Sequence, residues 1–383
     1  MLLDKNFDDI SINDIETLIT NNIRESKVID YKIKLPDNTR NSKKEFLADV
    51  SSFANSSGGH LIFGIKEVEG SPKEIESLQS INPDDEIQRL DNLLRTCIEP
   101  RIFGIRIKLI ENNDIKIIII RIPKSWAQPH VVSFEKHWRF YSRNSAGKYP
   151  LDVSELRTSF NISETIKSKI NNFHLDRINI INQNETPILL DGNLRIVLHY
   201  IPISAFDSNY TDIIPTNSCS FPQLPPIHSS GYSHRYNFEG FYSYSPTNNN
   251  MSIAYTQLFR TGIIEAVTAA YSHLLNSESL IFPIKGVEEL ILQYSETYLN
   301  TMQNYNIDLP IVILLTIAGF IGFELPHNER TMDLNTVPLS KNILIFDAIF
   351  LNEYNLDLLT LFKSTFDTLW NSFGAPYSFN YDR

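Results

Sequence analysis

The pattern of apolar and polar positions predicts alternating helices and strands in the first 160 residues. Four stretches have helical spacing or follow a capping residue, and the others alternate in polarity or form short apolar runs. The predicted helices cover residues 11–23, 42–54, 87–98 and 152–160. The predicted strands cover residues 27–33, 60–65, 105–110, 115–122 and 138–142. The pair 105–110 and 115–122 reads as a β-hairpin.

After a polar stretch at 161–185, which predicts a linker, the pattern starts anew. Strands are expected at 194–201, 232–238, 240–244 and 343–349, and helices at 257–274, 287–305 and 356–373. The apolar stretch 310–321 fits a strand and a buried helix equally well. We therefore predict an α+β protein, with a mixed α/β domain at 1–160 followed by a second mixed α/β domain at 186–383.

Composition agrees with a globular protein, because 42% of the residues are hydrophobic and 21% are charged. The net charge of −11 is unevenly spread. Residues 1–160 hold 23 Lys and Arg against 24 Asp and Glu, whereas the remainder holds 11 against 21. An acidic second half repels a polyanion, so a nucleic-acid surface is expected only in the first half. For residues 186–383 we expect a role in structure, sensing or dimerisation.

Cysteine use and hydropathy set the expected compartment. The two cysteines, Cys97 and Cys219, are too few for a disulfide framework and lack zinc-site spacing, which favours a reducing cytoplasm. The acidic N-terminus lacks the order of a signal peptide. The longest apolar runs, 117–122 and 311–323, are shorter than the ~20 residues of a membrane helix, so no membrane partner is expected.

One constellation of charged residues points to chemistry. On a strand, Asp30 and Lys32 point to the same face, and Glu25 can reach that face if the chain turns before the strand. Glu67 follows the next predicted strand and can join them. Three carboxylates repel one another unless a cation lies between them, and oxygen ligands suit Mg²⁺ or Mn²⁺. Such an ion can activate water while Lys32 stabilises developing charge, as in a metal-dependent nuclease. The alternative is that these are solvated acids at strand ends.

Basic side chains supply candidates for phosphate contact. Arg143 is favoured, because arginine binds phosphate through two parallel hydrogen bonds. The others are Lys32, Lys34, Arg40, Lys43, Lys44, Arg139 and Lys148. Each can equally be an ordinary surface charge. Tyr31, Trp138 and Tyr141 can stack on unpaired bases or belong to the core.

Several segments in the same order resemble the Schlafen AlbA-like domain over roughly residues 11–160. They are residues 25–32, the Phe-Ala-Asn-x-x-Gly-Gly segment with its following strand at 53–65, Pro123, Pro129 and residues 140–148. The resemblance implies a nucleic-acid-binding fold. In Schlafen ribonucleases, which act on tRNA and rRNA, three acids bind a divalent metal, and the matching positions here are Glu25, Asp30 and Glu67. Many relatives carry two acids after the Gly-Ile or Gly-Val pair, whereas Lys66 takes the first of those places here.

The second half resembles an uncharacterised region that follows this domain in many bacterial proteins, through residues 231–240 and 257–265. Schlafen nuclease cores pair two AlbA-like lobes, and this chain shows one copy, so the resemblance implies a homodimer. Three hypotheses follow. The first is a metal-dependent endoribonuclease, with a tRNA-like substrate, in antiphage defence. The second is a non-catalytic DNA- or RNA-binding regulator, and the third is a protein scaffold or stress sensor.

Overall fold

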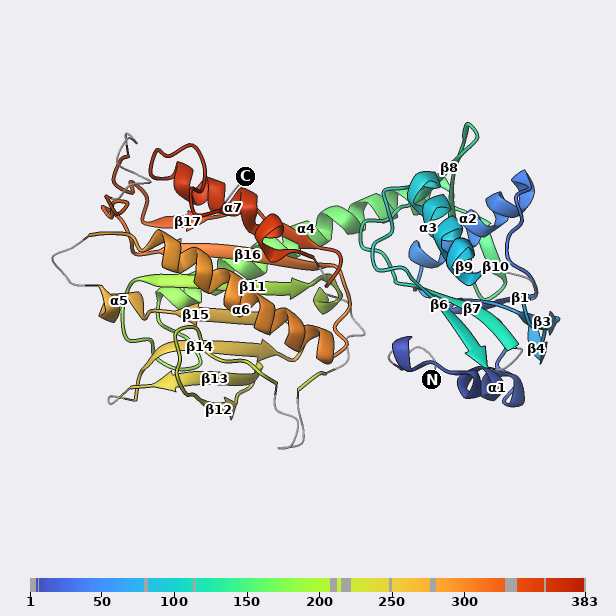
Figure 1. The fold of residues 1–383 in the computed structure, drawn as a ribbon, viewed down its shortest axis with the longest axis horizontal. Helices are drawn as coiled ribbons and strands as arrows, with labels where there is room; N and C mark the ends of the chain where they lie inside the picture. Colours follow the sequence, from blue (N-terminus) through green and yellow to red (C-terminus); the bar gives the residue numbers. More distant parts are fainter. Residues whose placement is uncertain are drawn as a thin grey trace. The chain divides into compact units, whose positions relative to one another are not determined.

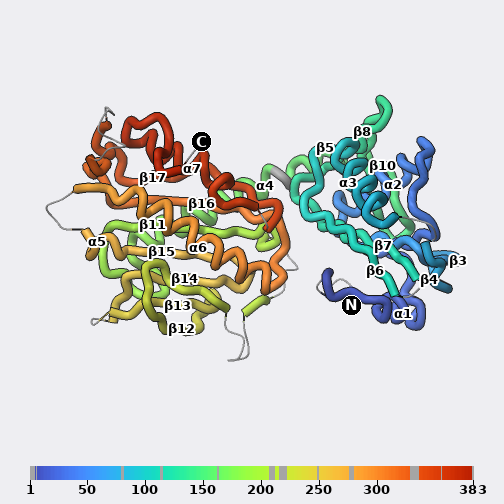
Figure 2. The backbone as a smooth tube through the Cα atoms, in the orientation of Figure 1, coloured from blue at the N-terminus to red at the C-terminus, as the bar shows by residue number. Residues whose placement is uncertain are grey.

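The chain folds into two compact units, unit 1 (Met1–Lys167) and unit 2 (Ser168–Arg383). The computed structural model describes residues 5, 7–78, 82–112, 115–206, 212–214, 222–247, 250–275, 280–327, 336–354 and 356–381. Figure 1 shows the elements of each unit, and Figure 2 follows the backbone through them. No helix in these ranges has both the length and the apolar character needed to cross a membrane.

A four-stranded mixed sheet forms the first layer of unit 1. In spatial order its strands are β1 (Ile29–Lys32), β2 (Gly59–Phe63), β7 (Ile115–Ile122) and β6 (Arg106–Asn112). Strands β1 and β2 are parallel, and the other neighbours are antiparallel. Apolar side chains of α1 (Ile12–Thr20) and the short helix η2 (Phe7–Asp9) form one core cluster with the sheet, and those of α2 (Arg40–Ala54) and α3 (Pro83–Cys97) form another.

A second, antiparallel sheet packs on the other side of α2. Its strands, in spatial order, are β10 (Gly147–Pro150), β9 (His137–Asn144), β8 (Val131–Phe134) and β5 (Ile98–Glu99). The core around α2 joins both sheets: Phe53 lies with Leu61 of the first sheet and Tyr141 of the second. Helix α2 therefore brings the end of β1 and the β9–β10 hairpin to one place.

A separate two-stranded ribbon, β3 (Ile65–Val68) and β4 (Ser71–Ile75), follows β2 directly. Gly64, with φ of +99°, ends β2 and redirects the chain. Between Lys66 and Glu67 the pairing with β4 shifts register. Such a bulge interrupts the alternation of side chains along a strand.

Unit 2 contains an eight-stranded sheet in which the paired strands are all antiparallel. In spatial order they are β12 (Ser233–Tyr236), β13 (Gly240–Pro246), β14 (Ser252–Phe259), β15 (Ile264–Thr268), β11 (Arg195–Pro202), β16 (Ile311–Ala318) and, beside β16, both β17 (Ile343–Ile345) and β18 (Ile349–Leu351). Shorter elements are η3 (Ile203–Phe206) and α5 (Tyr271–Leu274).

Helices cover both faces of this sheet. Apolar side chains of α6 (Ile284–Asn304) and α7 (Leu358–Asn371) form a core with Ile196, Leu198 and Tyr200 of β11. The last turns of α4 (Val153–Asn182) pack with Val197, which alternation places on the opposite face. The mixture of helices and mainly antiparallel sheets confirms the predicted α+β class.

The predicted boundary stretch 161–185 contains the division between the two units, which follows Lys167, but most of it is helical: α4 runs without interruption from Val153 to Asn182. Its inward positions in unit 2 include His174 and Arg177 beside Ile178 and Ile181, and all four are buried. Two polar residues on the inward stripe hide the helical period of apolar residues from a reading of the sequence.

The predicted helix at 257–274 is wrong: the stretch contains the end of β14, all of β15 and the short α5. Gly262, with φ of +90°, makes the turn between the two strands. Strands covered on both faces carry continuous apolar runs, which periodicity alone does not distinguish from a buried helix. For the same reason the apolar pattern of residues 310–321 fits both a strand and a buried helix. The structure shows that this stretch contains β16.

Candidate functional site

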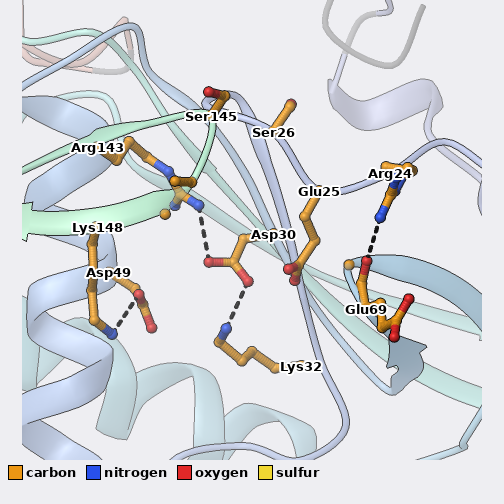
Figure 3. Close-up of a pocket in the computed structure, with 13 residues that line it drawn as sticks. Arg24, Glu25, Ser26, Asp30, Lys32, Asp49, Glu69, Arg143, Ser145 and Lys148 are labelled. Carbon is orange, nitrogen blue, oxygen red and sulfur yellow. Dashed lines mark hydrogen bonds and ion pairs between the residues drawn. The ribbon is translucent and has the colours of Figure 1, made fainter.

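An open cavity of about 620 Å³ lies in unit 1, where five stretches of the chain meet. They are the residues before β1, β1 itself, α2, the β3–β4 turn and the β9–β10 hairpin. The lining residues are Arg24, Glu25, Ser26, Asp30, Lys32, Asp49, Glu69, Gly70, Arg143, Ser145, Ala146, Gly147 and Lys148. Figure 3 labels ten of these residues. We call the space that the thirteen residues line the unit 1 cavity.

Asp30 lies between two cations. Its Oδ1 accepts a hydrogen bond from Lys32 Nζ at 2.6 Å, and its Oδ2 accepts one from Arg143 Nη2 at 3.1 Å (Figure 3). Burial alone raises the pKa of Asp30, but the charge and hydrogen bond of Lys32, with Glu25 and Arg143, outweigh it and lower the pKa below 3.8. Asp30 is therefore an ionised carboxylate, and it shares a face with Lys32 as strand alternation predicts.

Glu25 is held beside Asp30 by the backbone. Its N–H donates to the Gly70 carbonyl at 2.7 Å, and its Oε1 accepts from the Tyr31 N–H at 2.9 Å. Burial and a hydrogen bond to the Asp30 carboxyl raise the pKa of Glu25 to about 7. Two of the three predicted acids, Glu25 and Asp30, thus meet in one place.

The third predicted acid, Glu67, does not line the cavity. Its Oε2 accepts a hydrogen bond from the Gly70 N–H at 2.5 Å, within the β3–β4 turn. Glu69 lines the cavity instead, and its carbonyl accepts from Arg24 Nη2 at 2.8 Å. The register shift after Lys66 interrupts alternation along β3, and Glu69 lies beyond the end of β3 in the β3–β4 turn, with φ of +53°. Lys66 pairs with Glu74 at 2.7 Å and is also outside the cavity lining.

The predicted phosphate contacts divide into two groups. Arg143, Lys148 and Lys32 line the cavity, whereas Arg139, Lys34, Arg40, Lys43 and Lys44 do not. The Arg143 guanidinium lies 3.7 Å from the Phe53 ring centroid, and its Nε and Nη1 have no hydrogen-bond partner in the described part of the chain. Buried donors without a partner are rare in native proteins, and a strained contact or an ordered water or ion accounts for them.

Asp49 is a cavity residue that the sequence reasoning missed. It projects from α2 and accepts a hydrogen bond from Lys148 Nζ at 2.7 Å (Figure 3). Burial raises its pKa, against the opposing charges of Lys148 and Lys32. A signal for it exists in the sequence: Asp49 falls within the inward stripe of Phe46, Val50 and Phe53, where an acid needs a buried partner.

Charge in the cavity is nearly balanced. The lining carries four basic side chains, Arg24, Lys32, Arg143 and Lys148. It also carries four acidic side chains, Glu25, Asp30, Asp49 and Glu69. Within the described ranges, no three His, Cys, Asp or Glu side chains form a group able to hold a metal ion. Mg²⁺, however, is commonly bound by one or two carboxylates together with water and substrate phosphates. Glu25 and Asp30 fit that role if the substrate supplies the remaining oxygens.

Comparison with known proteins bears on unit 1. Residues 25–152 match the family model described as Schlafen, AlbA_2, which confirms the predicted resemblance for this third of the chain and supports nucleic-acid binding. No curated protein matches the sequence.

Two solved structures are similar to part of the chain. One is the DIP2311 protein from Corynebacterium diphtheriae, with 18% identity and a TM-score of 0.27 over 38% of this chain and 27% of that one. The other is the N-terminal domain of a protein related to the ATP-dependent DNA helicase RecG from Nitrosomonas europaea, with 20% identity and a TM-score of 0.24 over 30% of this chain and 74% of that one. The chain therefore spans about a quarter of the length of the first.

Proposed function

We propose that unit 1 binds RNA through the unit 1 cavity and cleaves it with a divalent metal ion, Mg²⁺ or Mn²⁺. The observation that carries the proposal is the contact between the Glu25 and Asp30 carboxyls in an open cavity that also holds Lys32, Arg143 and Lys148. Two carboxyls in contact repel unless they share a proton or bind a cation. A perturbed acid in a cleft is a common mark of a catalytic site.

Each residue has a defined task in this proposal. Glu25 and Asp30 would hold the ion, which would supply Lewis-acid chemistry by polarising the phosphate and activating water. Arg143 and Lys148 position the substrate backbone by contacting phosphate oxygens. Lys32 hydrogen-bonds Asp30 and carries positive charge at the edge of the reacting phosphate, where negative charge develops.

The substrate and setting follow the family resemblance. A tRNA-like RNA is the first substrate to test, and a defence response to phage is the proposed setting. With one AlbA-like unit per chain, a homodimer supplies the second lobe that the resemblance implies. Unit 2, which is acidic, then serves sensing or dimerisation.

The experiment uses the full chain with total tRNA, with Mn²⁺ or with EDTA. Glu25→Gln and Asp30→Asn are expected to lower cleavage about 100-fold or more, as expected when a group that stabilises charge in the transition state is removed. Glu74→Gln, in an exposed pair with Lys66, is the matched control and keeps full activity. Because Asp30 is buried between two cations, retained tRNA binding by Asp30→Asn shows that the variant is folded. Cleavage that persists in EDTA, or in both variants, contradicts the proposal.

A second candidate is a non-catalytic regulator that binds nucleic acid. The specific observation in its favour is that both Asp30 oxygens already accept hydrogen bonds from cations. This candidate predicts salt-sensitive binding that fails in Arg143→Ala and survives in Asp30→Asn, with no cleavage in any metal.

A further inference from the structure

The β8–β9 hairpin extends beyond the strands that flank it. Strand β5 pairs only with Val131 and Val132 of β8, and β10 pairs with β9 only from Tyr141 onward. The hairpin tip, residues 133–139, is therefore a two-stranded ribbon that no other strand of the described residues flanks. Figure 1 shows this hairpin projecting past α2 and α3 in unit 1.

The turn at the tip is tight and well defined. Glu135 and Lys136 have φ of +48° and +65°, and Phe134 pairs with His137 across them. Positive φ at both central residues is the type I′ geometry, whose twist matches that of a hairpin. The turn therefore continues the twist of the β8–β9 ribbon to its tip.

Trp138 has no structural explanation at the tip. It is 60% exposed, and the described residues include no ring that stacks on it. The other two aromatic candidates for stacking are core residues: Tyr31 is 1% exposed and donates to the Ile23 carbonyl, and Tyr141 is 9% exposed. Of the three aromatic residues predicted as candidates for stacking, only Trp138 has a largely exposed side chain.

The charges around Trp138 select the kind of ligand. Lys136, His137 and Arg139 are exposed beside it, and Arg40 of α2 reaches the tip to pair with Glu135. Arg139 and Trp138 point to opposite faces of the ribbon, and both faces are open beyond Phe140. An exposed indole on one face, with Lys136 at the turn and Arg139 on the other face, fits a nucleic-acid strand that passes around the tip, with a base on the ring and phosphates on the cations. It fits an apolar peptide poorly.

The tip and the cavity lie on the same strand. Arg143, which lines the cavity, is five residues from Trp138 along β9, so alternation places the two side chains on opposite faces, and a nucleic-acid strand that reaches both passes around the unpaired edge of the hairpin tip. At about 3.4 Å per residue this separation is ~17 Å along the strand. Stacked nucleotides advance ~3.4 Å each, so a stacked strand that reaches both positions has at least about five nucleotides.

We propose that the β8–β9 hairpin tip is a second nucleic-acid contact of unit 1, in which Trp138 stacks on an unpaired base of a strand whose backbone occupies the unit 1 cavity. This inference rests on the proposed function, and it adds the substrate class: a nucleic acid with an unpaired stretch long enough to reach from the cavity to the tip. Stacking does not require the ribose 2′-OH, so ribose and deoxyribose strands are separate arms of the test.

The experiment measures binding of the full chain to labelled uridine oligomers in EDTA, which prevents metal-dependent cleavage. Trp138→Ala is expected to weaken binding of a twelve-nucleotide strand at least about fivefold, the lower range for loss of one base–aromatic stack. Trp138→Phe keeps most of the affinity because it retains a ring. A three-nucleotide strand, too short to reach the tip from the cavity, is expected to bind wild type and Trp138→Ala equally. A deoxythymidine series identifies whether DNA binds in the same way.

The controls separate this inference from the proposed function. Phe238→Ala removes the 96% exposed ring of unit 2 and is expected to leave binding unchanged. If Arg143→Ala abolishes binding but Trp138→Ala leaves the long strand unaffected, the tip contact is wrong and cavity binding stands. Equal losses on both lengths, or in both Trp138→Ala and Trp138→Phe, indicate a structural effect and overturn the inference. If wild type binds no oligomer, both proposals fail.

Discussion

The protein contains two clusters of ionisable side chains, one in each unit, and they differ in how completely they are bonded. In unit 2, Glu265 is fully buried and accepts hydrogen bonds from Arg177 Nε and Nη2 at 2.7 Å each, from Tyr255 at 2.8 Å and from His199 at 2.9 Å. His174 then joins His199 to Thr316, with both contacts at 2.9 Å.

The unit 1 cavity is open, and its bonding is incomplete. Glu25 and Asp30 place two carboxyls in contact, and Arg143 has two donors without a partner in the described ranges. A closed and satisfied cluster stabilises one packing arrangement, here the seating of α4 on the sheet of unit 2. An open cluster with unsatisfied hydrogen-bond donors keeps groups that can bind water, an ion or a ligand. The two clusters therefore differ in the degree to which their hydrogen bonds are satisfied and not only in the number of their charges.

The largest expected effect comes from breaking the unit 2 cluster. Arg177→Met leaves Glu265 buried without its guanidinium, which costs about 3–5 kcal/mol of the free energy of unfolding. The measurement is denaturant unfolding followed by near-UV circular dichroism. Lys363→Met, which removes an exposed pair with Asp367, is the control and is expected to cost about 0.5 kcal/mol or less. A loss below about 1 kcal/mol in Arg177→Met contradicts a structural role for the cluster.

The next effect is a dependence of unit 2 stability on pH. Burial, with the neighbouring His199, lowers the pKa of His174 to about 3. The unfolded chain binds this proton below its ordinary pKa of about 6.5, so stability is full above 6.5 and falls as the pH drops toward 3, by up to about 1.4 kcal/mol per pH unit. His174→Gln is expected to flatten the curve of unfolding free energy between pH 6.5 and 5.

Between pH 6.5 and 5, the change in unfolding free energy comes from His174 and not from Glu265. The hydrogen bonds and charges of Arg177 and His199 overcome burial and lower the pKa of Glu265 to about 2. A depressed acid contributes stability above its unfolded pKa of about 4.5 and loses it as the pH falls toward 2, which lies below this range. Identical curves for wild type and His174→Gln would show that the histidine is not kept neutral by the fold.

The smallest effect sharpens the description of the unit 1 cavity. Glu69→Gln is expected to lower metal-dependent cleavage about tenfold, the lower range for residues that support a metal site. Glu67→Gln is expected to leave it unchanged, since an amide oxygen also accepts from the Gly70 N–H. Initial rates of tRNA cleavage at several Mn²⁺ concentrations distinguish the two. The opposite ranking would show that the turn rearranges when substrate binds and brings Glu67 into the site.

The sequence predicted the local features of unit 1 well. The glycine-rich turn after α2, the short apolar strand that follows and the shared face of Asp30 and Lys32 each depend on neighbouring residues alone. It did not predict that Glu69 lines the cavity while Glu67 does not, because the position of the turn at Glu69 and Gly70 depends on how β4 pairs with β3. Nor did it identify Asp49, whose partner Lys148 is 99 residues away in the chain.

The sequence alone determined the α+β class, the segments that resemble the AlbA-like family and the acidic character of the second half. These features follow from periodicity, short motifs and charge, which are local or additive properties of the chain. Only the tertiary structure decided which ionisable groups meet, which of them are fully bonded and which aromatic ring faces solvent. Those outcomes depend on contacts between residues distant in sequence, such as Asp30 with Arg143 and Arg177 with Glu265, and on the water that packing excludes around them.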